Sequence, residues 1–334
     1  MKQLLRQGTA AQCGVSLVEM MVSIALSLMV VLAATTVLLA SKSGHTSVDE
    51  TTRLQDAGRY ALDIISRNVR QTAYEQWDRT DAPIVVSRTF TPSIIGLDGQ
   101  TLGATSEAML TPQTPGGIKS DVLALRFFGS SDASGADGTV LNCAGYAVPA
   151  PTSVASADAE RAWSIFYVKE SSSGEPELRC KYRSASGWAS DAIVPGVESF
   201  QVLYGLDTSS TTANTSSGMP TRFLRASAID ALDNTLTLTG DTDAAKALDK
   251  LRQSHWKKVV AVKIALLMRG TLPTRLNDPL QFDLFDAKYA GKYAGVDLGT
   301  SVVEGDLRAS ERDRLRKIFS ATILLRNHVA GSGT

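Results

Sequence analysis

The chain has 334 residues, of which 43% are apolar and 20% are charged, a balance typical of a globular protein that can bury a hydrophobic core. It carries 34 basic and 34 acidic residues, so its formal net charge is zero. These figures exclude a strongly basic chain whose overall field attracts nucleic acid. No nucleic-acid partner is indicated.

Residues 15–40 form an apolar run whose only charged residue is Glu19. A helix rises about 1.5 Å per residue, so this run is long enough to cross a hydrocarbon layer of roughly 30 Å. The residues before it contain Lys2 and Arg6 and no acid, which by the positive-inside rule keeps them in the cytoplasm. The pattern predicts a membrane helix, with the rest of the chain exported.

Gly14 stands in an unusual place for an export signal. A secretory signal peptide has its apolar run before the cleavage site, whereas Gly14 precedes the run, so a cut after it would leave the helix on the mature protein. Glu19 is also unusual, because a carboxylate within hydrocarbon is costly and usually serves a specific partner. We therefore expect Glu19 to have a function.

The basic leader, Gly14 and the segment VSLVEMMVSIAL, with Glu19 fifth after the glycine, resemble the type IV prepilin signature. The resemblance implies that the prepilin peptidase, a membrane aspartyl enzyme, cuts after Gly14 and methylates the new amino terminus at Val15, where phenylalanine or methionine is commoner. It also implies that Glu19 neutralises the terminal amine of a neighbouring subunit in a filament, which offsets their desolvation. The alternative is an interfacial glutamate tolerated near the helix end.

Beyond residue 40 the pattern predicts an amphipathic continuation of the helix over residues 41–78. Its inner face repeats every three or four residues through Leu54, Ala57, Ala61, Ile64, Ile65, Asn68, Val69 and Thr72. The opposite face, expected to be solvated, carries Arg53, Asp56, Arg59, Asp63, Arg67 and Arg70. The segment 81–83 ends the pattern with a proline, which interrupts helices.

After residue 83 the apolar period shifts toward two, which is typical of strands. The expected strands are residues 121–128, 162–169, 177–183, 197–207, 256–270 and 316–327. The run 256–270 is apolar at both alternating sets of positions, which predicts a central strand buried on both sides. A short helix is expected over 241–256, capped by Asp241 or Thr242. The chain is thus predicted to be α+β, with an antiparallel β-rich head.

Three segments narrow the resemblance within the pilin-like proteins: RLQDAGRYALDIISRNVRQTAY, WKKVVAVKIALLMR and RLRKIFSATILLRN. They look like the PilW type of minor pilin, whose relatives include the GspJ pseudopilins of type II secretion. The implied fold is pilin-like, with a long helix packed on an antiparallel head. The implied domains are a removed leader (1–14), a transmembrane helix (15–40), its amphipathic continuation (41–78) and a globular head (79–334).

The same resemblance implies a minor pilin that primes the assembly of type IV pili and is incorporated near their tip. Its expected partners are other minor pilins, the major pilin, the prepilin peptidase and the pilus assembly platform. It would be a single-pass protein of the bacterial inner membrane, with its head in the periplasm, before it enters the pilus. The alternatives are a GspJ-like pseudopilin, or a tip adhesin or DNA-uptake module.

The sequence gives little support for an enzyme. His45, His255 and His328 are scattered and form no HExxH pair. There is no G-x-S-x-G nucleophile elbow. The segment PGGIKSD lacks the glycine spacing of a phosphate-binding loop, so the chain is not the assembly ATPase. We expect no catalysis and no cofactor.

Acidic and basic loop residues are expected to be solvated. Asp278, Asp283, Asp286, Asp132 and Asp137 could offer oxygen ligands to calcium, but neither group has the spacing of a helix-loop-helix calcium loop. The basic run 308–317 lacks the interleaved aromatic residues that stack on bases. We expect it to be a surface segment that leads into the last strand, and we expect no metal site.

Cys143 and Cys180 remain if Cys13 is removed with the leader. They flank or enter predicted strands on either side of residues 162–169, and export to an oxidising compartment would preserve a bridge between them. We therefore predict a Cys143–Cys180 disulfide. The alternative is two unrelated buried thiols, since free cysteine behaves as a small hydrophobic residue.

Overall fold

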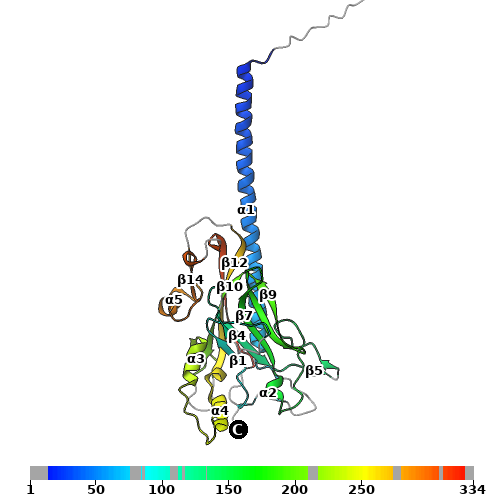
Figure 1. Cartoon of the computed structure of the whole chain (residues 1–334), viewed down its shortest axis with the longest axis vertical. Helices are drawn as coiled ribbons and strands as arrows, with labels where there is room; N and C mark the ends of the chain where they lie inside the picture. Colours follow the sequence, from blue (N-terminus) through cyan, green and yellow to red (C-terminus); the bar gives the residue numbers. More distant parts are fainter. Residues whose placement is uncertain are drawn as a thin grey trace, which may run out of the picture. The chain divides into compact units, whose positions relative to one another are not determined.

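The computed structural model describes residues 14–75, 84, 87–105, 112–114, 117–132, 134–209, 217–273, 280–307 and 311–327, without the side chain of residue 43. The leader with Cys13, the segment 81–83, Asp278 and His328 lie outside these residues. The chain forms two units, residues 1–49 and 50–334. The helix α1 (Leu17–Gln71) contributes to both, and every strand belongs to the second unit (Figure 1).

The second unit contains two main antiparallel sheets. The first has the order β1-β4-β7-β8-β9, and the second has the order β11-β10-β12-β15. The strands of the first are Ile94–Leu97, Val122–Phe127, Ala162–Glu170, Pro176–Ser184 and Gly187–Pro195. The strands of the second are Arg222–Leu224, Val197–Leu206, Val259–Pro273 and Arg314–Leu324. The α+β antiparallel class expected from the sequence is confirmed.

Smaller elements complete the unit. Three two-stranded sheets pair β2 (Thr101–Leu102) with β3 (Pro112–Gln113), β5 (Ser131–Asp132) with β6 (Gly135–Ala136), and β13 (Gln281–Asp283) with β14 (Ser301–Val303). The short helices are α2 (Ala157–Glu160), α3 (Ala226–Asp233), α4 (Asp243–Gln253), α5 (Ala287–Tyr293), η1 (His255–Lys258) and η2 (Glu304–Asp306). Thr242 caps α4, because its side chain accepts a hydrogen bond from the Ala245 N–H.

The main core lies where the second part of α1 and both sheets contribute apolar side chains. Strand β12 lies between β10 and β15, with Ile264 opposite Val202 on one side and Ala321 on the other. Ile264 and its even-numbered neighbours enter the main core, whereas Ala265 and Leu267 pack on the opposite face of the sheet against the β13–β14 region. The expected central strand, buried on both sides, is confirmed.

The inner face of α1 fits closely against strand β15. Gly58 makes this approach possible, because a Cβ atom there would lie 2.5 Å from the Phe319 ring. Leu54, Ala61 and Ile65 are buried at helical spacing in the same core. The opposite face is exposed at every arginine and aspartate named for it above. The amphipathic pattern thus predicted which face of the helix is buried.

The helix ends at Gln71, before the boundary expected at residue 78. Ala73 adopts φ 58°, the left-handed conformation that often follows a helix, and its N–H donates to the Arg126 carbonyl of β4 at 3.0 Å. Asn327 donates its side-chain amide to the carbonyls of Arg70 and Thr72, at 3.3 Å each. The chain therefore leaves the helix to join the sheet.

A buried carboxylate joins α1 to the end of β12. Glu50 is 3% exposed and accepts hydrogen bonds from the Thr271 N–H at 2.8 Å and the Thr271 hydroxyl at 3.0 Å. Gly270 leaves room for it, since a Cβ atom there would lie 2.7 Å from Glu50 Oε2. These bonds determine where along its length the helix contacts the strand.

Arg316 corrects the expectation for residues 308–317. This arginine is not on the surface: its side chain is fully buried, and it contacts Glu198 Oε2 at 2.7 Å and Glu304 Oε1 at 3.1 Å. It lies opposite Arg269 on β12, and Glu198 also contacts that guanidinium, at 3.2 Å. Residues 308–310 lie outside the described chain. The two neighbouring cations remain buried because glutamates compensate their charges.

The predicted disulfide between Cys143 and Cys180 is present, with Cα atoms 5.8 Å apart. Cys180 lies in β8 opposite Phe166 of β7. Cys143 lies in a turn, and its N–H donates to the Ser164 hydroxyl of β7 at 2.9 Å. The bridge therefore connects the loop that follows β6 to the middle of the first sheet.

We expect the double variant Cys143→Ala/Cys180→Ala to lower the free energy of unfolding by up to about 4 kcal/mol, because the bridge closes a loop between cysteines 37 positions apart. Urea unfolding of the full chain in detergent micelles measures this loss. As a control, reductant should lower the stability of the wild type and leave the double variant unchanged. Two free thiols in the folded wild type would contradict the bridge.

Candidate functional site

The amino-terminal residues Gly14, Val15 and Ser16 precede α1 in an exposed stretch without regular secondary structure. The helix then starts with a serine cap, since the Ser16 side chain accepts from the Val18 N–H at 3.3 Å and its carbonyl accepts from the Met20 N–H at 3.0 Å. Glu19 lies in the first turn, where a negative charge is favourable next to the positive end of the helix dipole.

The first part of α1 is exposed on all sides. Each residue from 14 to 42 is exposed, although most of them are apolar. It is the single helix in the described chain that is long and apolar enough to cross a membrane. Apolar surface on this scale is unstable in water, so lipid or other protein must cover it.

The polar side chains of this segment are satisfied along the helix itself. The hydroxyls of Ser23 and Ser27 donate to carbonyls four residues earlier, both at 2.7 Å. Thr35 and Thr36 donate to carbonyls three residues earlier, at 2.9 and 2.8 Å. Such bonds allow hydroxyls to enter an apolar medium. Glu19 differs, because within the described part of the chain its carboxylate has no hydrogen-bond or ion-pair partner.

The predicted site residues thus fall in two separate places. Gly14, Val15 and Glu19 lie within the first turns of an exposed apolar segment, and Cys143 and Cys180 lie together in the head. The geometry leaves Gly14 and Val15 accessible to an enzyme and Glu19 available to a charged group from another molecule. The cleavage and the pairing themselves remain predictions.

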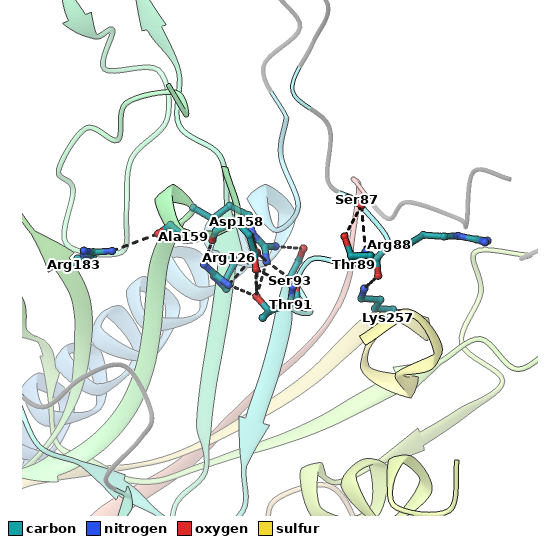
Figure 2. Close-up of polar contacts among 11 residues, drawn as sticks. Ser87, Arg88, Thr89, Thr91, Ser93, Arg126, Asp158, Ala159, Arg183 and Lys257 are labelled. Carbon is teal, nitrogen blue, oxygen red and sulfur yellow. Dashed lines mark hydrogen bonds and ion pairs between the residues drawn. The ribbon is translucent and has the colours of Figure 1, made fainter. Parts of the chain in front are cut away.

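A second polar cluster lies in the head, where it anchors the segment before β1 (Figure 2). Arg126 of β4 and Arg161 at the end of α2 are 5% and 1% exposed. Both contact Asp158 of α2 and the Thr91 hydroxyl. Arg161 also donates to the Ser93 hydroxyl at 3.0 Å. An arginine within an otherwise apolar strand, as in DVLALRFF, is the sequence signal of such a buried cation.

Burial and the neighbouring charges shift the pKa values of the ionisable groups in this cluster. Burial lowers the pKa of Arg126 to about 9, and the neighbouring Arg161 cation adds to this effect while Asp158 opposes it. Burial alone would raise the pKa of Asp158, but Arg161, the Thr91 N–H and Arg126 outweigh it, so the pKa is lowered. Burial and the charge of Arg161 also lower the pKa of Lys257 to about 8, and this lysine donates to the Arg88 carbonyl (Figure 2).

A serine, a histidine and an aspartate meet at the start of η1. The Ser254 hydroxyl and His255 Nδ1 both contact the Asp233 carboxylate, at 2.6 and 2.8 Å. Ser254 and His255 therefore both bond to Asp233, whereas in a catalytic triad the histidine lies between the serine and the acid. Ser254 also accepts from the Trp256 N–H at 3.3 Å. This arrangement caps the turn and joins it to α3.

Comparisons with known proteins agree with the amino-terminal pattern and extend into the head. The family model described as type IV pilus-assembly protein W matches residues 165–327, and the prokaryotic N-terminal methylation motif matches residues 9–35. No curated protein matches the chain. Among solved structures, a type IV-like pilin from Thermus thermophilus is 13% identical, with 83% of this chain and 98% of that chain covered and a TM-score of 0.33. A score this low supports no structural inference.

We expect Asp158→Asn to lower the free energy of unfolding by about 2 to 3 kcal/mol at pH 7, because two buried arginines lose their shared anion. Asp158 is partly exposed, so this loss is smaller than that for a fully buried ion pair. Its lowered pKa means that this carboxylate stabilises the fold above its usual range near pH 4 and loses that effect as the pH falls further. The difference between variant and wild type should therefore shrink in acid, as measured by urea unfolding at several pH values.

Asp63→Asn is the matched control for this measurement. Asp63 pairs with Arg67 on the exposed face of α1 at 2.5 Å, and such surface pairs contribute only about 0.3 to 0.5 kcal/mol. Equal losses in the two variants would contradict a supporting role for the buried cluster.

Proposed function

We propose that the chain is a non-enzymatic minor pilin of the PilW type, which primes filament assembly and is incorporated near the tip; the matches to the pilus-assembly protein W model and to the N-terminal methylation motif support this. The observation that carries the proposal is Glu19, which has no hydrogen-bond or ion-pair partner among the described residues and lies in the exposed apolar part of the helix that follows Gly14. Its role would be to pack its helix among those of other minor pilins and the major pilin.

Processing comes first in this proposal. The prepilin peptidase would cut after Gly14 and methylate the amino group of Val15, which leaves α1 as an anchor in the inner membrane. The apolar run of residues 15–40 spans about 39 Å as a helix, which exceeds the roughly 30 Å of a hydrocarbon layer. Lys2 and Arg6 would keep the leader in the cytoplasm, and the head would fold in the periplasm, where the disulfide persists.

Assembly follows from the charges that processing creates. Cleavage produces a cation at Val15, one helical turn before the anion of Glu19. When the helix leaves lipid for the interior of a filament, both charges lose solvation, and pairing of Glu19 with the terminal amine of a neighbouring subunit offsets that cost. The assembly platform would extract subunits in which this pairing is available.

A GspJ-like pseudopilin of type II secretion would use the same helix and the same pairing. The match of residues 165–327 to the pilus-assembly protein W model favours the pilus. The two functions differ in what is lost when the gene is deleted: surface filaments in one case, secreted proteins in the other. Each variant below is therefore tested in a deletion strain by both readouts.

Gly14→Ala should block processing, because the peptidase must accommodate a residue without a side chain at the cut. The chain itself does not require this glycine, since a Cβ atom at Gly14 meets nothing within 4 Å. Mass spectrometry of the membrane fraction should find the variant with its leader attached. Gly44→Ala, another helix-region glycine with no atom within 4 Å of an added Cβ, should be processed normally. Normal cleavage of Gly14→Ala would contradict the prepilin assignment.

Glu19→Val should insert into the membrane at wild-type levels and fail to restore filaments in the deletion strain. The helix becomes more apolar but cannot neutralise a neighbouring amine. Imaging of surface filaments and crosslinking to other minor pilins measure the loss, which we expect to be about tenfold or more. Ser27→Val is the matched control, because it raises hydropathy in the same helix and removes no charge. Wild-type filament numbers with Glu19→Val would refute the pairing, and lost secretion with normal filaments would assign the chain to type II secretion.

A further inference from the structure

Three aspartates from distant parts of the sequence meet where the first sheet approaches β10. Asp98 follows β1, Asp121 precedes β4, and Asp297 lies in the turn after α5. One carboxylate oxygen from each lies within 4.8 Å of the others. The loop acids considered from the sequence, such as Asp283, are not part of this group.

Two of the carboxylates are held in place by the backbone. Asp121 is 2% exposed and lies beside β10, where its own N–H donates to the Phe200 carbonyl at 2.7 Å. Asp98 accepts from the first turn of α3. Asp121 accepts hydrogen bonds from the N–H groups of Gly99 at 2.9 Å and Val202 at 2.8 Å. Asp98 accepts from the N–H groups of Ala226 at 2.8 Å and Ser227 at 2.9 Å. Such bonds orient the carboxylates and leave further lone pairs available to a ligand.

Asp297 provides an independent observation. Its residue is 2% exposed, and its Oδ2 accepts from the Tyr289 hydroxyl at 2.7 Å. Its Oδ1 is buried and has no hydrogen-bond partner among the described residues. A buried oxygen without a partner is costly. This oxygen belongs to the carboxylate that lies beside Asp98 and Asp121, so a ligand in that place would satisfy it.

Little positive charge lies next to the three acids within the described chain. Arg225, whose Nε lies 3.6 Å from Asp98 Oδ2, forms the one ion pair recorded for these three acids within the described chain. Burial raises the pKa of Asp121 well above its usual range, and the charges of Asp98 and Asp297 add to that effect. Burial likewise raises the pKa of Asp297. Three acids beside one arginine therefore repel one another when ionised.

We propose that Asp98, Asp121 and Asp297 bind one calcium ion. Calcium takes carboxylate and other hard oxygen ligands at about 2.3 to 2.6 Å, so two oxygens on one ion are at most about 5 Å apart, which agrees with the spacing found here. Magnesium requires about 2.0 to 2.1 Å and a near-ideal octahedron. The ion would neutralise the repulsion and satisfy Asp297 Oδ1.

A bound ion would join three parts of the head. Asp98 and Asp121 lie at the same end of the paired strands β1 and β4, where Leu97 is opposite Val122, and Asp297 comes from the turn between α5 and β14. Gly299 shows how closely this turn packs, because a Cβ atom there would overlap the Lys119 carbonyl. Calcium would therefore attach the β13–β14 region to the sheets, in addition to the contacts of Leu284 and Val302.

The test uses the full chain in detergent micelles, stripped with chelator and then titrated with calcium or terbium. In 10 mM calcium we expect the melting temperature to rise by about 5 °C, if the affinity is that of an extracellular calcium module. Terbium bound at the site should show luminescence sensitised by Tyr289, whose hydroxyl contacts Asp297. Calcium should displace that signal.

Asp297→Asn is the decisive variant, because it keeps the shape and removes one ligand charge. It should lose more than about tenfold in calcium affinity, because calcium affinity depends on the number of charged ligands. Asp132→Asn, at an exposed acid of β5 outside this group, should respond to calcium as the wild type does.

Three results would overturn the proposal. The first is no calcium-dependent shift and no terbium signal in the wild type. The second is an undiminished response in Asp297→Asn. The third is an equal response to magnesium, which would remove the assignment to calcium. In the single variant the remaining acids could still bind calcium weakly. The double variant Asp121→Asn/Asp297→Asn should therefore show neither a calcium-dependent rise in melting temperature nor terbium luminescence.

Discussion

The physical constraint behind this molecule is that the surface of an apolar helix must be covered. Between residues 15 and 40 the chain has no polar face, and each of these residues is exposed. The hydroxyls within it bond to the helix backbone, which removes their need for water. Glu19 has no such bond among the described residues, and for this reason we propose a partner for it on a second molecule.

The same helix obeys a different constraint after residue 50. There one side must pack on β-strands and the other must face solvent, so small residues such as Gly58 and Ala61 alternate with charged ones. Gly58 admits the Phe319 ring, and a larger residue would separate helix and sheet. A single continuous helix thus carries two sequence patterns, because its second part packs on strands on one side and faces solvent on the other, whereas its first part is apolar on all sides.

The features that could be predicted from the sequence are those that repeat locally. The period of apolar residues predicted the inner face of α1 and the buried β12, and the glycine with its glutamate indicated the family. Strand β9 (Gly187–Pro195) was missed, since most of its residues are only partly buried or exposed and it is an edge strand. The disulfide could be proposed from export chemistry, but only the fold brings Cys143 beside β8.

Features that depend on distant residues could not be predicted. Arg316 looked like part of a solvated basic run, because nothing near it in the sequence shows that Glu198 and Glu304 lie on either side of it. The three aspartates beside β10 were missed for the same reason: each is an ordinary loop acid until the sheet topology brings them together. Thr242, by contrast, was correctly considered as a cap because capping is local.

The bonds of Glu50 to Thr271 have a mechanical consequence. In the filament that we propose, tension along α1 would act on the head in part through the bonds of Glu50. The carboxylate accepts from both the N–H and the hydroxyl of Thr271, and a slip of the helix by one turn would leave this buried acid unpaired. Tension would therefore pass to β12, which is hydrogen-bonded along its length to β10 and β15.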